Sequence, residues 1–113
     1  MQVSPERFEK LVSEAIDLIP DDLLGLIDNV VFLIEDEGEE PGILGLYDGI
    51  PLTERGDYGI GELPDRIFIY RLPLCQMCES DEEIVHEVIT TVVHEVAHHF
   101  GIDDDRLHEL GWD

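Results

Sequence analysis

The chain has 113 residues, of which 43% are hydrophobic, and this length suits one domain spanning residues 1–113. Six basic residues against 28 acidic ones give a formal net charge of −22. Such a surface favours solubility and repels nucleic-acid phosphates and anionic membranes, so we expect neither as a partner, whereas a basic peptide or protein is attracted. No apolar stretch has the roughly 20 residues of a membrane span. No apolar signal segment follows the N-terminus, so the expected location is cytoplasmic.

The N-terminal part of the sequence predicts a helix, a helical turn and a strand. Ser4 is suited to cap a helix, and Pro5 is suited to its first position. Apolar residues then recur at three-to-four spacing between residues 8 and 19, as in an amphipathic helix. A single helical turn is expected at residues 21–26, and the β-branched run at residues 30–34 predicts a buried strand.

The middle of the chain predicts connectors and two short strands. Residues 35–41 are largely acidic and indicate a solvated connector. Residues 42–61 hold six of the ten glycines and indicate an extended loop with a short strand at 44–47, which could line a cleft. Residues 66–71 alternate between inward and outward positions, as expected for a strand covered on one face.

Cys75 and Cys78 form the only C-x-x-C pattern in the chain. A four-cysteine zinc site is excluded because no second pair exists. A strand is expected before the pair and a helix after it, which is compatible with a redox motif. Two ordinary thiols near the end of a strand are the preferred interpretation.

The C-terminal part predicts a long buried helix. Ser80 and Glu83 have the spacing of a capping box. Apolar residues then cover much of the helix circumference up to Phe100, and Gly101 is placed to end the helix. A second short helix is expected at residues 103–110.

This buried helix carries the pattern H-E-x-x-H as His94, Glu95 and His98. Residues four apart lie one turn apart on one helix face, so the two imidazoles can share a metal ion. Glu95 is offset from both ligands and borders the open side of the metal. That is the place for a general base that activates a water molecule.

The third metal ligand is expected after Gly101, where the backbone can turn back toward the site. In the extended pattern H-E-x-x-H-x-x-G-x-x-D this position is Asp104, and two imidazoles, one carboxylate and one water complete a catalytic zinc site. Its neighbours Asp103 and Asp105 could replace it if the turn differs. Weaker candidates are His99, His108 and Glu109. The same ligands also suit iron and other first-row metals.

At these residues the sequence resembles the zincin-like metallopeptidases, the minimal zincins of bacteria. The resemblance rests on HEVAHHFGIDDDRLHELGW at residues 94–112, GLYDGIPL at 45–52 and LPDRI at 63–67. It implies a small α+β fold in which a short mixed sheet packs against the active-site helix and the N-terminal helix. One strand would edge a cleft suited to an extended peptide. It further implies Zn²⁺ held by His94, His98 and Asp104, with Glu95 as the base.

The resemblance favours a zinc-dependent metallopeptidase that acts on a peptide or protein substrate. An alternative is a zinc-binding interaction module with little turnover. Larger metzincins place a methionine-containing turn after their third ligand, and its absence here motivates this alternative. Both methionines of the chain lie upstream of the expected third ligand. A third hypothesis, from the net charge, is an acidic interaction protein without a metal. Tyr47, Arg55 or Arg66 could assist an oxyanion, although packing of the tyrosine and ion pairing of the arginines are the preferred interpretations.

Overall fold

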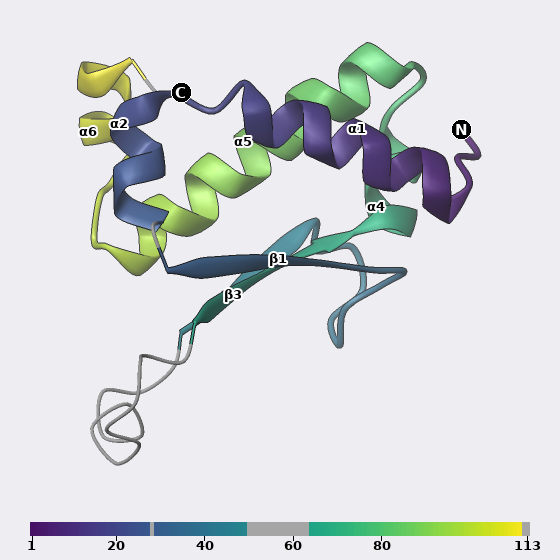
Figure 1. The fold of residues 1–113 in the computed structure, drawn as a ribbon, viewed down its shortest axis with the longest axis horizontal. Coiled ribbons are helices and arrows are strands. Elements are labelled where there is room, and N and C mark those ends of the chain that lie inside the picture. The colour runs from purple at the N-terminus through teal and green to yellow at the C-terminus, as the bar shows by residue number, and fades with distance from the viewer. Residues whose placement is uncertain (28, 50–63, 112–113) are drawn as a thin grey trace.

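A computed structural model describes residues 1–27, 29–49 and 64–111 of the chain, with residues 26, 104 and 110 described by their backbone alone. Helices and strands are mixed along the chain (Figure 1). The elements are α1 (Pro5–Asp17), α2 (Asp21–Leu24), the 3-10 turn η1 (Gly25–Ile27), β1 (Val30–Glu35), β2 (Gly45–Asp48), β3 (Asp65–Tyr70), α4 (Arg71–Met77), α5 (Asp81–His99) and α6 (Asp104–Leu110).

The three strands form one mixed sheet in the order β1-β3-β2. β3 is central, parallel to β1 and antiparallel to β2. Its side chains Ile67 and Ile69 are fully buried on the face that meets the helices. The predicted α+β class with a short mixed sheet is therefore confirmed.

Strand β1 corrects one prediction from the sequence. The β-branched run predicts burial of residues 30–34, but their side chains alternate between half-buried and exposed positions. Val31 is 40% and Leu33 is 37% exposed. The reason is that β1 is an edge strand, and no helix of the described residues covers the outer face of the sheet (Figure 1). A β-branched run alone does not distinguish this position from a fully covered one.

Helix α5 lies at the centre of the fold. It packs against α1 on one side and against β2 and β3 on the other (Figure 1). Helix α1 presents the predicted apolar face, with Phe8, Leu11, Val12 and Ala15 buried. Helix α5 buries seven residues, which agrees with the prediction of a deeply placed helix. Burial of apolar surface on both sides of α5 fixes the helix that carries His94 and His98.

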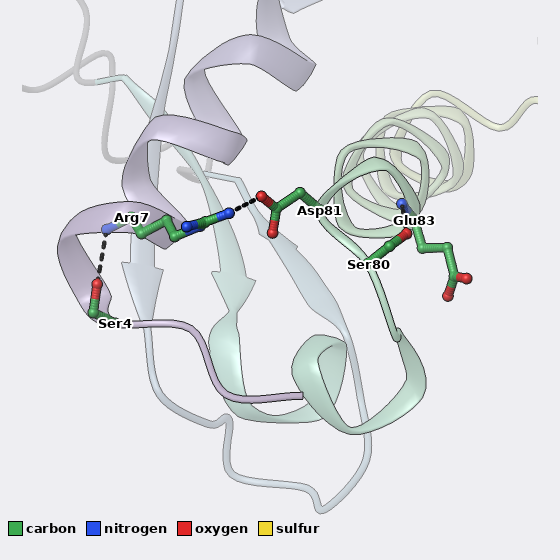
Figure 2. Close-up of polar contacts among 5 residues, drawn as sticks. All are labelled: Ser4, Arg7, Ser80, Asp81 and Glu83. Carbon is green, nitrogen blue, oxygen red and sulfur yellow. Dashed lines mark hydrogen bonds and ion pairs between the residues drawn. The ribbon is translucent and has the colours of Figure 1, made fainter.

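Both long helices begin with the caps that the sequence predicted (Figure 2). Ser4 Oγ accepts a hydrogen bond from the Arg7 amide, and Ser80 Oγ accepts one from the Glu83 amide, each at 3.2 Å. The carboxylate of Glu83 accepts from the amide of Glu79 rather than from Ser80. Arg7 also forms an ion pair with Asp81, which connects the starts of α1 and α5.

Helix α4 was not predicted. The alternation of residues 66–71 predicts a strand throughout, but β3 ends at Tyr70 and a helix begins at Arg71. Pro73 is tolerated because it lies in the first turn, where a backbone N–H has no partner within the helix. Cys75 therefore lies within a helix, and Cys78 lies directly after it.

The expected strand at residues 44–47 is observed as β2, shifted by one residue, and the remainder of the predicted loop from residue 50 onward lies outside the described residues. None of the described helices has the length and apolar character needed to cross a membrane.

Candidate metal centre

His94 and His98 lie on the last two turns of α5, one turn apart on the same face. Their rings are nearly parallel, with an interplanar angle of 22° and a centroid separation of 6.4 Å. His94 is half-buried and His98 is exposed. Zinc–nitrogen bonds of about 2.0–2.1 Å at tetrahedral angles require two ring centroids roughly 5–6 Å apart. The observed separation of 6.4 Å is close to this range, so the spacing of the pair is compatible with one shared zinc ion.

Glu95 points toward strand β2. Its Oε2 atom accepts a hydrogen bond from the backbone amide of Tyr47 at 3.3 Å. The register of the sheet explains why this amide does not bond to β3. Tyr70 N–H bonds to Leu44 C=O, and hydrogen-bonded pairs alternate along an antiparallel ladder. The peptide groups of Gly45 and Tyr47 therefore point away from β3, toward the edge of β2 where Glu95 lies. Among the described residues no other strand pairs with this edge, which is called the free edge of β2 below.

Tyr47 connects several parts of this region. Its hydroxyl donates to Asp65 Oδ2 at 2.6 Å, and Asp65 is only 8% exposed. Its ring stacks on His99 with a centroid separation of 3.9 Å. His99 is thus directed to β2 and away from the face shared by His94 and His98. The side chain of Tyr47 packs against His99, as expected, and its backbone amide lies beside the candidate base Glu95.

Helix α5 ends with the turn that the glycine predicted. Gly101 has a φ of 72°, in the left-handed region that suits glycine. The amide of Ile102 bonds to Ala97 C=O at 2.7 Å and the amide of Gly101 bonds to His98 C=O at 3.2 Å. This pair of bonds is the Schellman motif. The chain reverses here and enters α6 at Asp104.

The predicted third ligand, Asp104, is the first residue of α6, and its side chain lies outside what the structure describes. Among the described side chains, no three His, Cys, Asp or Glu residues converge on a metal position. Asp103 caps α6, because its Oδ1 accepts from the Arg106 amide at 2.8 Å. Glu109 pairs with Arg106. The assignment of Asp104 remains a prediction.

None of the weaker candidate ligands completes a three-residue group with the histidine pair among the described side chains. Asp105 and His108 are exposed on α6. The candidate oxyanion residue Arg66 forms an ion pair with Asp48 and lies 5.5 Å from the centroid of the Phe68 ring. Its guanidinium is therefore engaged on the outer face of the sheet, as the ion-pairing interpretation predicted. Arg55 lies outside the described residues.

A large pocket adjoins Glu95 at the edge of β2. Its volume is about 710 Å³, and its described lining contains six carboxylates and two aromatic rings. The lining residues are Glu35, Glu37, Gly38, Glu39, Glu40, Ile43, Gly45, Leu46, Asp48, Phe68, Tyr70 and Glu95. Burial raises the pKa of the Tyr70 hydroxyl, and the nearby carboxylates of Glu35, Glu39, Glu95 and Asp48 raise it further.

Reasoning from the sequence missed this pocket. The composition of residues 35–41 indicates a solvated connector, yet Gly38 lies against the ring of Tyr70. A Cβ atom at Gly38 would come within 2.7 Å of Tyr70 Cε2, so this close approach depends on glycine. The one feature of the sequence that could have indicated this contact was Gly38, a glycine within an acidic run.

The family model of the zincin-like metallopeptidases matches residues 27–112. The chain belongs to this family. Zincins are generally zinc-dependent peptidases, so membership indicates metallopeptidase chemistry in broad terms. The match spans both the HExxH segment of α5 and the sheet that borders it.

Comparison with solved structures supports the fold. A conserved hypothetical protein from Thermus thermophilus is similar, with a TM-score of 0.54 and 23% sequence identity. The similarity covers 87% of this chain and 94% of that one. At this identity the likeness concerns the fold alone. Comparison with curated proteins gives no match.

Proposed function

We propose that the chain is a zinc-dependent peptidase in which His94, His98 and Asp104 hold the metal and Glu95 is the general base. One observation carries the proposal. Glu95 lies in the helical turn that bears both histidines and faces β2, where its carboxylate accepts the hydrogen bond from the Tyr47 amide. A general base must lie beside both the water and the substrate, and a position next to the histidines and the strand edge supports this role for Glu95.

The free edge of β2 supplies a place for the substrate. The peptide groups of Gly45 point away from β3, and Gly45 lines the pocket beside Glu95. An extended peptide can pair with such an edge through main-chain hydrogen bonds. This pairing would bring a scissile bond to the side of the helix that carries His94 and Glu95.

Bound zinc would supply the Lewis acidity that polarises a peptide carbonyl and acidifies a water. The protein supplies the proton transfers. Glu95 accepts a proton from the attacking water and passes it to the leaving amine. The hydrogen bond from the Tyr47 amide occupies Oε2 and orients the carboxylate, which leaves Oε1 available for the water.

The test combines metal content with cleavage of a peptide library by the wild type and three variants. We expect about one zinc per chain in the wild type and in Glu95→Gln, and zinc loss in His94→Ala. Cleavage should disappear in both Glu95→Gln and His94→Ala. The third variant, His86→Ala, is the matched control, because His86 is an exposed histidine on the same helix, and it should retain zinc and activity.

Two results would contradict the proposal. Zinc binding without cleavage of any peptide would favour an interaction module with little turnover. Absence of zinc affinity after reconstitution would rule out the metal site altogether. Asp104→Asn tests the third ligand separately, and its zinc affinity should fall while its fold is unchanged.

A further inference from the structure

The pocket beside β2 has the charge of a site for a cation. Its carboxylates come from four parts of the chain, namely the end of β1, the connector that follows it, β2 and α5. No lysine or arginine belongs to its lining in the described residues. Arg71 pairs with Asp36 and Arg66 with Asp48, so the described cations near the sheet neutralise only one of these carboxylates.

The arrangement of these carboxylates argues against a metal ion as the occupant. Within the described residues, no three of them are close enough to share one ion. They are spread around a volume of about 710 Å³ instead. A long side chain with a charged end fits such a distribution better than a point charge does, because its ammonium or guanidinium can reach several carboxylates.

Tyr70 provides a second and independent indication of a ligand. The residue is 4% exposed and lines the pocket, yet none of the described residues makes a hydrogen bond with its hydroxyl. No fully buried polar side-chain atom of the described chain lacks a partner, so this hydroxyl keeps some solvent access, and Tyr70 is one of the residues that line the pocket. Its ring stacks with Phe68 at 6.3 Å, and together they form an apolar floor suited to an aliphatic stem.

The direction of a bound peptide connects this pocket with the metal centre. Side chains of an extended strand alternate between the two faces of a sheet. A peptide paired with the free edge of β2 would place one set of side chains toward α5 and the other toward the outer face. Leu46 and Phe68 share this outer face and line the pocket.

We propose that this pocket binds a lysine or arginine side chain of the extended peptide and makes the protein selective for basic peptides. The inference rests on the proposed function, since it assigns a substrate class to the same site. The carboxylates attract the charged end, Tyr70 Oη meets it or its hydration shell, and the two rings contact the methylene stem.

The test uses two dye-labelled peptides rich in serine and alanine. One carries lysine at every second position, and the other carries norleucine there, which keeps the stem and removes the charge. Binding is measured by fluorescence anisotropy in the Glu95→Gln background, so that cleavage plays no part. Cleavage of the same peptides by the zinc-loaded wild-type protein is measured separately.

The pocket variant carries Glu35→Gln, Glu37→Gln, Glu39→Gln and Glu40→Gln. A matched control carries Glu6→Gln, Glu9→Gln, Glu14→Gln and Glu82→Gln. The four control residues are exposed and lie outside the pocket, so the control removes the same net charge. Tyr70→Phe removes only the hydroxyl and keeps the ring.

We expect about tenfold tighter binding of the lysine peptide than of the norleucine peptide, given the modest contribution of each partly exposed charge. This preference should fall to within about twofold in the pocket variant, persist in the control, weaken in Tyr70→Phe and decrease with added salt. An equal loss in both charge variants would overturn the proposal, because the preference would then come from the overall charge. So would the absence of any preference.

Failure of the proposed function would give a different pattern. A lysine preference that depends on the pocket, without cleavage of either peptide, would refute the peptidase and leave the basic-peptide site standing. Cleavage of both peptides at equal kcat/KM, with no preference in binding, would refute the site and leave the peptidase standing.

Discussion

The amide of Tyr47 donates to Glu95 across 48 positions of sequence, and this bond joins the edge strand β2 to α5, the helix that carries the candidate metal site. The bond needs the strand to approach α5 closely. Gly45 allows that approach, since a Cβ atom there would lie 2.6 Å from Thr91 Cγ2 and 2.8 Å from the Phe68 carbonyl oxygen. The position of the candidate base therefore depends on a glycine at the start of β2.

Gly45→Ala should move β2 away from α5 and separate Tyr47 from Glu95. Overpacking of this kind costs about 1–3 kcal/mol of unfolding free energy. Urea denaturation should detect that loss, and cleavage should decline further than stability alone explains. Gly25→Ala is the control, because a Cβ atom added there would meet no described atom within 4 Å and the φ of −62° suits alanine. Equal stability of the two variants would argue against the close approach.

Tyr47→Phe removes the hydroxyl that donates to the buried carboxylate of Asp65. A hydrogen bond to a charged group contributes roughly 1.5–3 kcal/mol, so the free energy of unfolding should decrease by about this amount. The unfolding temperature should fall accordingly. The backbone amide is unchanged, and zinc affinity should therefore equal that of the wild type. A loss of zinc in this variant would mean that Tyr47 supports the metal centre through more than its amide.

The starts of α1 and α5 and the end of α5 could be predicted because their signals are local, whereas α4 was not predicted. Ser80 lies three residues before Glu83, and the capping bond forms within one turn. Gly101 similarly ends α5 through bonds that reach back only to His98 and Ala97. The spacing of His94 and His98 on one face follows from helix geometry alone.

The partners of the site residues could not be predicted, because they depend on long-range packing. Nothing near Glu95 in the sequence indicates that Tyr47 will supply its hydrogen bond. The composition of residues 35–41 is that of any solvated segment, and it does not indicate that Gly38 packs against Tyr70. The exposure of β1 likewise follows from its position at the edge of the sheet, which residues 30–34 do not specify.

Ser80→Ala should weaken the start of the helix that carries the site. Loss of an N-cap hydrogen bond costs about 1 kcal/mol, which chemical denaturation can resolve. Arg7→Ala removes the ion pair with Asp81 at the same end of the molecule. The two side chains are 60% and 35% exposed, so this variant should lose less stability than Ser80→Ala. A larger loss of unfolding free energy in Arg7→Ala would show that the ion pair contributes more than the cap to the stability of this end of the molecule.

The thiol of Cys78 should behave as a structural group. It is 2% exposed, and burial raises its pKa, with Glu87 and Glu83 adding to the shift. The folded chain holds the thiol proton more tightly than the unfolded chain. The resulting stability is present below the ordinary thiol pKa and is lost as pH rises through it toward the raised value.

Alkylation of Cys78 at neutral pH should accordingly be about tenfold or more slower in the folded chain than in urea. A Cys75→Ala variant reports Cys78 alone, and Cys78→Ala serves as the comparison. Rapid labelling of the folded protein, or ready formation of a Cys75–Cys78 disulfide, would restore the redox interpretation of the C-x-x-C pair.

Zinc occupancy should fall as acid competes for the imidazole ligands. Protons and metal bind the same nitrogen atoms, and histidine has an ordinary pKa of about 6.5. Occupancy should therefore be full near about pH 8 and largely lost by about pH 4.5, as measured with a zinc-sensitive dye. His86→Ala should follow the wild-type curve, because its side chain lies on an exposed part of α5 away from the pair. Occupancy that stays flat over this range would contradict ligation by His94 and His98, since carboxylates alone lose metal at lower pH.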